Sequence, residues 1–283
     1  MADSAAAITS APLLEVDGLN VVYPGHGWRR PGFHALHDVS LQIAPGETLG
    51  LVGESGSGKT TLGRAVLGLT EVQSGSIRFN DVDISNANRR TRGNLSRDIQ
   101  VIFQDPYSSL NPAMTVADIL GEPLSAQGVS RVKAAARIDD LLERIGLPAD
   151  SGVRYPRDFS GGQRQRIAIA RALALDPKLI VCDEPVSALD LSTQARVLDL
   201  LIDVQRRTGV AYLFISHDLS VVRYISHRVA VMLRGEIVES GEGEVVTSQP
   251  SHPYTQKLLL ASPIPDPALQ AERRNQYLAL PTF

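Results

Sequence analysis

Cysteine is almost absent from this 283-residue sequence, which contains only Cys182. A single thiol excludes an internal disulfide, and it provides too few ligands for a cysteine-bound zinc or iron–sulfur site. Because Cys182 belongs to the apolar run 179–182, we expect it to be a buried and unreactive side chain.

Long hydrophobic runs are also missing. No segment approaches the roughly 18 to 20 consecutive apolar residues that a membrane-spanning helix requires. The first twelve residues lack the basic start and the apolar core of a secretory signal peptide. Since apolar residues still make up 43% of the sequence, we expect a globular cytoplasmic protein that can dock on a membrane protein.

The sequence has no excess of positive charge, because its formal net charge is −3. Proteins that bind nucleic acid usually carry a basic face, so we expect no nucleic-acid partner. Four arginines gather at 89–97, and we interpret this segment as a solvated loop rather than a phosphate-binding patch. No internal repeat or low-complexity tract is visible.

The most informative stretch is GESGSGKTT at 53–61. An apolar run precedes it and apolar residues at helical spacing follow it, which predicts a strand, a loop and a helix. Glycines allow consecutive N–H groups to surround an anion, and the helix N-terminus adds its positive dipole end. Lys59 then reaches the β- and γ-phosphates of a nucleotide, and the Thr60 hydroxyl is a ligand for Mg²⁺. The predicted phosphate-binding residues are Gly53, Ser55, Gly56, Gly58, Lys59, Thr60 and Thr61.

A second motif follows the apolar run 179–182, which ends in Asp183 and Glu184. Asp183 can hold Mg²⁺ through water, and Glu184 can polarise the water that attacks the γ-phosphate. A surface turn has the same composition, so two acids after a strand are weak evidence by themselves. They become strong evidence because a phosphate loop precedes them in the same chain. His217 follows another strand-like run and can bond the γ-phosphate at the same sheet edge, although such a histidine is more often a cap.

A second anion-binding helix start is predicted at Ser160-Gly161-Gly162. Its hydroxyl, backbone donors and helix dipole repeat the chemistry of the phosphate loop, although a simple helix cap has the same composition. Two such helix starts suggest a nucleotide enclosed between them. The second face belongs either to a moving subdomain or to another subunit, and the spacing does not choose between them.

The order of the predicted elements indicates an α/β fold. Strands and helices alternate after residue 178, which favours a parallel sheet wrapped by helices. The N-terminal third mixes antiparallel strands with one strand–loop–helix unit, and 105–170 is interpreted as a helical insertion. We predict strands at 13–23, 34–43, 48–52, 75–79, 99–103, 178–182 and 211–216, helices at 134–145, 160–175, 193–207, 218–225 and 254–261, and a hairpin at 229–239.

The ordered set of motifs resembles the ATP-binding subunits of ABC transporters over residues 13–245. The motifs are the phosphate loop, Gln104, the signature-like segment 159–163, Asp183-Glu184, the segment 187–190 and His217. The resemblance implies a P-loop NTPase (RecA-like) core with a parallel sheet, an N-terminal antiparallel β subdomain and an inserted α-helical subdomain. It also implies three parts: a flexible tail at 1–11, an ATP-binding domain at 12–250 with its helical subdomain at 105–170, and a C-terminal extension at 251–283.

The resemblance assigns further roles. Residues 160–163 would face ATP held by a second ATPase subunit in a head-to-tail dimer, and Asp190 would bridge the two sites. Gln104 would sense the γ-phosphate and report to the membrane subunits, and Tyr23 would stack on adenine. The predicted site therefore comprises catalytic Glu184, His217 and Gln104, the Mg²⁺ ligands Thr60, Gln104 and Asp183, and the additional ATP contacts Tyr23, Ser160, Gly161, Gly162, Gln163 and Asp190.

Finer matches at 104–112, 154–156, 184–190 and 252–255 resemble the oligopeptide, dipeptide and nickel importers, and within them the second of the two ATPase subunits. The resemblance implies an ATPase at the cytoplasmic face of the membrane that drives uptake of short peptides. Its partners would be a homologous or identical ATPase subunit, two transmembrane permease subunits and an extracytoplasmic substrate-binding protein. Some relatives bind an iron–sulfur cluster in a cysteine-rich C-terminal segment, for which this chain lacks the ligands.

Two alternatives remain open. The same machinery would serve for nickel, glutathione or opines, because the cargo contacts lie in other chains. An ABC ATPase of DNA repair or translation is the other alternative. Such proteins usually carry a coiled-coil arm, paired ATPase domains or a basic face, and none of these features is visible here.

Overall fold

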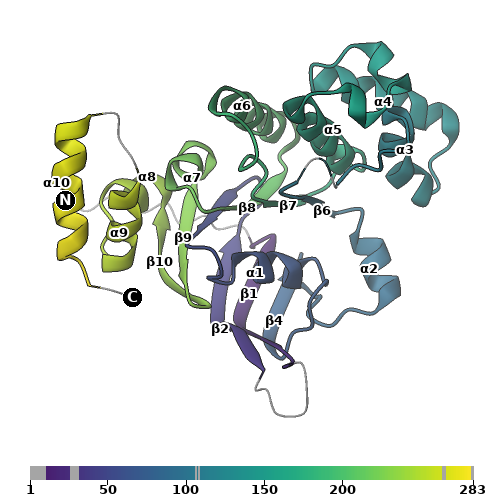
Figure 1. Ribbon diagram of the computed structural model, residues 1–283. Helices are drawn as coiled ribbons and strands as arrows, with labels where there is room; N and C mark the ends of the chain where they lie inside the picture. Colours follow the sequence, from purple (N-terminus) through teal and green to yellow (C-terminus); the bar gives the residue numbers. More distant parts are fainter. Residues whose placement is uncertain (1–10, 26–31, 106, 108, 263–265, 282–283) are drawn as a thin grey trace, which may run out of the picture.

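The computed structural model describes residues 11–25, 32–105, 107, 109–262 and 266–281 (Figure 1). Of the predicted tail at 1–11, only residue 11 is among them. The strands are β1 (Leu14–Tyr23), β2 (Phe33–Ile43), β3 (Thr48–Val52), β4 (Ser74–Phe79), β5 (Val82–Asp83), β6 (Ile99–Ile102), β7 (Leu179–Asp183), β8 (Ala211–Ser216), β9 (Arg228–Leu233) and β10 (Glu236–Glu242).

The helices are α1 (Lys59–Val66), α2 (Arg89–Leu95), α3 (Val116–Ala126), α4 (Arg131–Arg144), α5 (Gly161–Leu173), α6 (Leu191–Thr208), α7 (Leu219–Ile225), α8 (Gly243–Ser248), α9 (Pro253–Ala261) and α10 (Pro267–Ala279), with 3₁₀ turns η1 (Ala149–Val153) and η2 (Pro156–Asp158). Within the described ranges, none of these helices has the length and apolar character needed to span a membrane.

The central sheet has the strand order β10-β9-β3-β8-β7-β6. Strands β9, β3, β8, β7 and β6 are parallel, and β10 closes the edge as the antiparallel partner of β9, which confirms the predicted hairpin. Val52 pairs with Ser216, and Ile102 pairs with Cys182. The carboxyl ends of β3, β8, β7 and β6 therefore meet at one edge, where an open α/β sheet binds its ligands.

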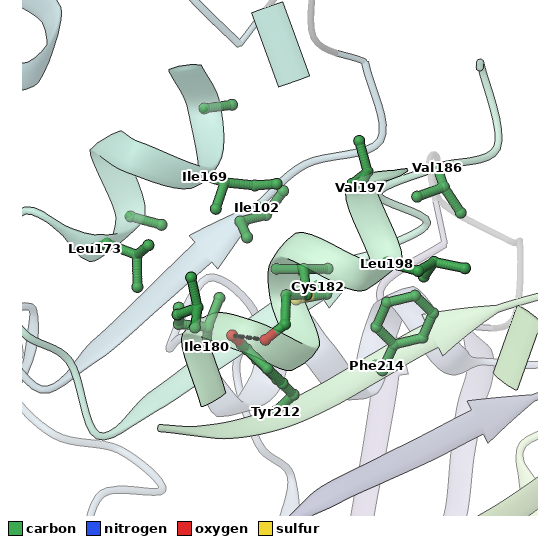
Figure 2. Close-up of a cluster of buried hydrophobic side chains, with 14 of the residues drawn as sticks. Ile102, Ile169, Leu173, Ile180, Cys182, Val186, Val197, Leu198, Tyr212 and Phe214 are labelled. Carbon is green, nitrogen blue, oxygen red and sulfur yellow. Dashed lines mark hydrogen bonds between the residues drawn. The ribbon is translucent and has the colours of Figure 1, made fainter. Parts of the chain in front are cut away.

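Alternation along the buried strands divides the core into two layers. In β8, Leu213 and Ile215 face the layer that contains α1 and the N-terminal strands, whereas Tyr212 and Phe214 face α5, α6 and α7. Figure 2 shows Tyr212, Phe214 and Cys182 in this second layer. Cys182 is fully buried, which confirms that part of the prediction, and burial raises the pKa of its thiol far above its ordinary range.

The antiparallel sheet has the order β2-β1-β4-β5 and lies on the α1 side of the central sheet (Figure 1). Its strands β1 and β2 pair from Leu14 opposite Ile43 to Tyr23 opposite Phe33. Buried residues of α1, of this sheet and of the central sheet form one apolar cluster, so α1 is held between the two sheets. The phosphate loop therefore enters a helix that is packed on both sides.

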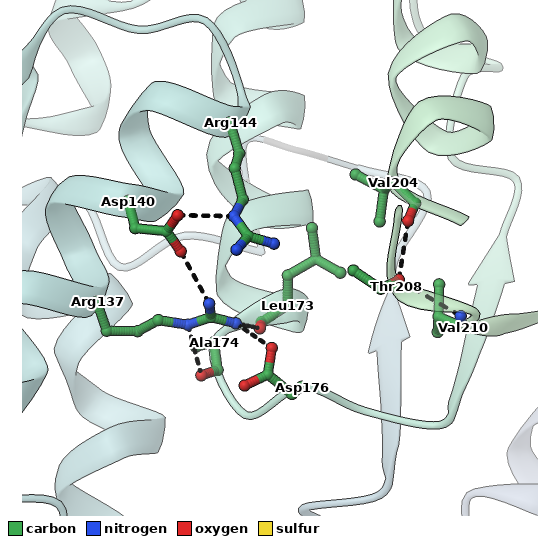
Figure 3. A network of polar contacts seen from close by, with 9 residues as sticks. All are labelled: Arg137, Asp140, Arg144, Leu173, Ala174, Asp176, Val204, Thr208 and Val210. Atoms are coloured by element: carbon green, nitrogen blue, oxygen red, sulfur yellow. Dashed lines mark hydrogen bonds and ion pairs between the residues drawn. The ribbon is translucent and has the colours of Figure 1, made fainter. Parts of the chain in front are cut away.

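The helical region between β6 and β7 contains α3, α4 and α5, and Arg137 joins α4 to the end of α5 (Figure 3). Its guanidinium donates to the carbonyl oxygens of Leu173 at 2.8 Å and Ala174 at 3.4 Å. It also pairs with Asp140 at 2.8 Å and with Asp176. Because the last carbonyls of a helix have no partner within it, Arg137 satisfies two of them and fixes the two helices together.

The structure contradicts one prediction and adds elements to the C-terminal part. Segment 89–97 is not a loop, because its first residues form α2, with Asn88 accepting the N–H of Thr91. Arg92 folds back onto the chain and donates to the carbonyl oxygens of Val66, at 3.1 Å, and Ile84. Burial lowers the pKa of Arg92. Helices α8, which has six residues, and α10 were not predicted.

Candidate nucleotide-binding site

The phosphate loop leads from β3 into α1 with backbone angles that favour glycine. Gly56 and Gly58 have φ values of 82° and 107°, in the left-handed region. A Cβ on Gly53 would lie 2.1 Å from the carbonyl oxygen of Met232 in β9. Around Gly56, in contrast, a Cβ would meet no described atom within 4 Å apart from those of Gly56 and its two chain neighbours. The loop is therefore packed tightly at its start and open at its tip.

Lys59 is a buried cation at the start of α1. Its Nζ donates to the carbonyl oxygens of Gly53 and Glu54, at 2.7 Å each. Burial lowers the pKa of Lys59, and the nearby charges of Glu184 and Asp183 partly oppose this effect. The ammonium is thus held inside the loop by two of the loop's own carbonyl groups.

Thr60 and Asp183 form the second pair of the site. The Thr60 Oγ1 donates to the Asp183 Oδ1 at 3.1 Å, across 123 residues of sequence. Burial raises the pKa of Asp183, and the hydrogen bond from Thr60 opposes part of that shift. A hydroxyl and a carboxylate in a partly desolvated position fit Mg²⁺, which takes one or two protein oxygens and completes its shell with phosphate and water.

Glu184 is the centre of a third group. Its Oε2 accepts a hydrogen bond from Gln104 Nε2 at 3.2 Å and lies 3.2 Å from His217 Nδ1. The three residues come directly after or within two residues of the ends of β7, β6 and β8, which are adjacent strands. Glu184 has a φ of 50°, an uncommon conformation for a side chain other than glycine, and its N–H donates to Ile215.

The residues at the start of α5 form a separate group. Ser160 Oγ accepts the N–H of Gln163 at 3.4 Å, and Gln163 Oε1 accepts the N–H of Ser160 at 3.0 Å. A Cβ on Gly162 would lie 2.3 Å from Thr193 Cγ2, and a Cβ on Gly161 would lie 3.4 Å from the Tyr107 hydroxyl. Among the described residues, no hydrogen bond or ion pair joins this segment to the phosphate loop.

Asp190 lies beside this second group rather than beside Lys59. Its Oδ1 accepts the N–H of Thr193 at 3.0 Å and the hydroxyl of Ser192 at 2.7 Å, which caps α6. The hydrogen bonds from Ser192 and Thr193 hold the pKa of Asp190 well below its ordinary range. The structure therefore brings Asp190 close to the signature-like segment through Thr193, which contacts Gly162.

Tyr23 reaches the first turn of α1. Its hydroxyl lies 3.4 Å from Thr61 Oγ1, to which it donates, and 3.4 Å from Thr70 Oγ1. Burial alone would raise the pKa of Tyr23, but the bonds to Thr61 and Thr70 and the charge of Arg64 outweigh it and lower the pKa. The predicted adenine-stacking residue is thus next to the predicted phosphate contact Thr61.

Two tyrosines near these groups were missed. The hydroxyl of Tyr254 accepts the N–H of Glu54 in the phosphate loop at 3.0 Å. The ring of Tyr107 lies 4.4 Å from the guanidinium carbon of Arg164, at the start of α5. Tyr254 belongs to the segment 252–255 and Tyr107 to the segment 104–112, two of the finer matches to the importers, but no local pattern predicts the contact of either tyrosine.

The fold and the site together define a P-loop nucleotide-binding domain. The family model described as "ABC transporter" matches residues 36–187, which is more than half of the chain. Among solved structures, cbiO1 of Clostridium perfringens, part of the ABC transporter complex cbiONQ, superposes with a TM-score of 0.75 at 28% identity over 85% of this chain and 92% of that one. The dimeric ADP- and phosphate-bound cassette MJ0796 has a TM-score of 0.71 at 27% identity over 81% and 98%.

The curated relatives are also ATP-binding proteins. The glutathione import ATP-binding protein GsiA of Salmonella paratyphi A is 51% identical over 276 residues, which cover 94% of this chain and 44% of that protein. The Escherichia coli K12 protein of the same name is 56% identical over 242 residues, covering 85% and 39%. This chain belongs to the ABC transporter family. It spans less than half the length of these curated relatives.

Proposed function

We propose that this chain is the ATP-hydrolysing subunit of an ABC importer, located at the cytoplasmic face of the membrane. The observation that carries the proposal is the convergence at one sheet edge of Lys59, the Thr60–Asp183 pair and the Glu184 group. A phosphate-holding cation, a magnesium pair and a water-polarising carboxylate are the parts that phosphoryl transfer requires. We place the ATP-binding domain at 12–250, with its helical subdomain at 105–170 and the extension at 251–283.

ATP binds first to the phosphate loop. The backbone N–H groups of the loop surround the phosphates, and Lys59 exchanges its bonds to the loop carbonyls for the β- and γ-phosphate oxygens. Thr60, Asp183 and Gln104 would hold Mg²⁺, which would neutralise negative charge on the phosphates. Tyr23 stacks on the adenine. Burial raises the pKa of Asp183 although Thr60, Arg64 and Lys59 oppose the shift, and a cation bound at this position would favour the carboxylate further.

Glu184 then activates water. It accepts the proton of the attacking water as the bond from water oxygen to the γ-phosphorus forms and the bond to the β–γ bridging oxygen breaks, which releases ADP. Gln104 and His217 fix its Oε2 and can turn to the γ-phosphate. Glu184 has its left-handed φ of 50° directly after β7, where its side chain meets Gln104 and His217.

Closure of a head-to-tail dimer couples ATP to transport. The start of α5, at 160–163, would face the γ-phosphate held by a second ATPase subunit, homologous or identical, and Asp190 would lie between the two sites. ATP bound across this interface favours the closed state, and hydrolysis removes that preference. The dimeric state of the MJ0796 cassette supports this arrangement. Two permease subunits and an extracytoplasmic binding protein complete the importer.

The cargo we propose is a short peptide. The relatives that are 51–56% identical are named as glutathione import proteins, and glutathione is a tripeptide, so it is the first candidate. Mass spectrometry of the ligand that purifies with the assembled importer tests this proposal. Recovery of a metal ion or an opine instead of a peptide contradicts it.

Substitution of Glu184 by glutamine tests the enzymatic part. We expect Glu184→Gln to retain ATP binding and to lose hydrolysis by about 10²- to 10⁴-fold, because the amide cannot take the water proton. Calorimetry with ATP and a phosphate-release assay measure the two effects. The matched control is Glu236→Gln, on the exposed start of β10, which should hydrolyse ATP at the wild-type rate. Hydrolysis by Glu184→Gln at that same rate refutes the assigned role.

A further inference from the structure

The start of α9 contacts the phosphate loop, although it lies 200 residues away in sequence. Tyr254 is 1% exposed, and its hydroxyl oxygen accepts the backbone N–H of Glu54 at 3.0 Å. Burial raises the pKa of Tyr254, so the phenol stays neutral and keeps its hydroxyl group at physiological pH. Tyr254 lies outside the region 36–187 that matches the family model.

The segment Gly53-Glu54 is held from two sides. Lys59 binds the carbonyl oxygens of both residues at 2.7 Å, and Tyr254 binds the N–H of Glu54. When phosphate enters, Lys59 has to divide its three donors between the loop and the phosphate oxygens. The bond from Glu54 to Tyr254 does not involve Lys59, so it does not depend on how Lys59 divides its donors.

Tyr254 is itself fixed to the central sheet. Glu239 of β10 accepts the N–H and the hydroxyl of Ser251, at 2.7 Å each, and the N–H of His252 at 3.2 Å. His252 Nδ1 in turn accepts the N–H of Tyr254 at 3.2 Å, which caps α9. A chain of hydrogen bonds therefore leads from the β10 edge strand through the start of α9 to the phosphate loop.

We propose that Tyr254 is a positioning residue for ATP binding, through which the C-terminal extension fixes the Gly53-Glu54 segment in the conformation that receives phosphate. The inference rests on the proposed function, because it concerns the same nucleotide site. It assigns to the extension a role within the ATPase site of its own chain.

Removal of one hydroxyl group tests the inference. We expect Tyr254→Phe to raise the KM for ATP about 2- to 10-fold, which corresponds to the loss of one ordinary hydrogen bond. The kcat at saturating ATP should stay within about twofold of wild type, because Tyr254 does not touch the Glu184 group. ATPase kinetics over a range of ATP concentrations and the melting temperature with and without ATP are measured on the full chain.

Tyr212→Phe is the matched control. Tyr212 is 0% exposed, and its hydroxyl donates to the carbonyl oxygen of Leu201 at 3.1 Å, away from the phosphate loop. Both variants lose one buried phenol hydroxyl, so both should lower the melting temperature without ATP. Only Tyr254→Phe should raise KM. If Tyr254→Phe fails to fold, Glu239→Gln, which loosens the start of α9, is expected to raise KM in its place.

Three results would contradict the proposals for Tyr254 and for the chain. An unchanged KM in Tyr254→Phe, or in Glu239→Gln where that variant is needed, overturns the inference. An equal rise of KM in Tyr254→Phe and Tyr212→Phe also overturns it, because the effect then follows general destabilisation. A wild-type chain that binds no ATP refutes the proposed function instead, so the two failures are distinguishable.

Discussion

Two helix N-termini in this molecule have similar glycine- and hydroxyl-containing sequences but different hydrogen bonding. At α1, the N-cap residue is Gly58, and no side chain caps the helix. At α5, Ser160 and Gln163 cap each other in a reciprocal box. Since the first N–H groups of a helix have no partner within it, α1 presents its donors for a ligand, whereas α5 satisfies part of its own set.

The charged surroundings of the two termini differ as well. Lys59 at α1 has the carboxylates of Asp183 and Glu184 close enough to affect its pKa. Near the start of α5, Arg164 donates to the carbonyl oxygen of Phe159 at 2.9 Å and stacks on Tyr107. The neighbouring carboxylate of Asp190 accepts the N–H of Thr193 and the hydroxyl of Ser192, so its charge is used to cap α6. The carboxylates near Lys59 therefore fit a metal-bound phosphate, whereas the one near α5 serves a neighbouring helix, and this difference fits the unequal roles proposed for the two termini.

The largest effect is expected for a substitution at α1, where it should lower ATP affinity. Lys59→Ala removes the ammonium that we place on the β- and γ-phosphates, and we expect ATP affinity to fall at least about 100-fold, or about 2.7 kcal/mol. Isothermal titration calorimetry with Mg-ATP measures it. Lys133→Ala, on the exposed face of α4, is the control and should bind as wild type does. Equal ATP affinities for the two variants would contradict the assignment of the phosphate loop to the ATP-binding site.

A smaller effect is expected at the other end of α5. Arg137 is 18% exposed and binds two helix-terminal carbonyls and two carboxylates, so Arg137→Ala should lower the free energy of unfolding by about 2 kcal/mol. Arg144, which is 34% exposed and pairs with Asp140 alone, should lose less than about 1 kcal/mol on substitution by alanine. Urea denaturation compares them. ATP affinity should change in neither variant, and a larger loss from Arg144→Ala would contradict the reasoning.

The sequence predicted the sheet and the phosphate loop because their signals are local. Apolar runs of strand length, a glycine-rich turn and a helical period all lie within about 20 residues of each other. The residues at strand ends, Asp183, Glu184 and His217, were predicted to meet at one edge because parallel strands end together. That geometry is what Figure 1 and the strand pairing show for the carboxyl ends of β3, β8, β7 and β6.

Contacts between distant segments could not be predicted in the same way. Arg92 lies in a polar, arginine-rich stretch, and only the carbonyls of Val66 and Ile84 explain why it folds back onto the chain. Tyr254 meets Glu54 across 200 residues, and no periodicity encodes that pairing. The roles proposed for residues 160–163 and Asp190 involve a second subunit, and neither sequence spacing nor the contacts within one chain encode such a pairing.

The smallest effect is expected for Ser160. Its substitution tests whether the N-terminus of α5, like that of α1, contacts a nucleotide. Ser160→Ala removes the cap of α5, so we expect the free energy of unfolding to fall by about 1 kcal/mol. ATP affinity of the separate chain should not change, because the phosphate loop has its own helix. In a Glu184→Gln background, however, ATP-dependent pairing of chains should weaken, as measured by light scattering.

Thr115→Ala is the matched control for this prediction, because Thr115 caps α3 in the same reciprocal box with Asp118. It should lose a similar free energy of unfolding and leave pairing intact. If both variants pair equally well with ATP, the hydroxyl at the start of α5 serves only its own helix. The two N-termini would then differ in function as well as in capping, and the second face of the nucleotide site would have to lie elsewhere. A selective loss in Ser160→Ala instead means that the helix gives up its own cap when it meets the γ-phosphate of a neighbouring chain.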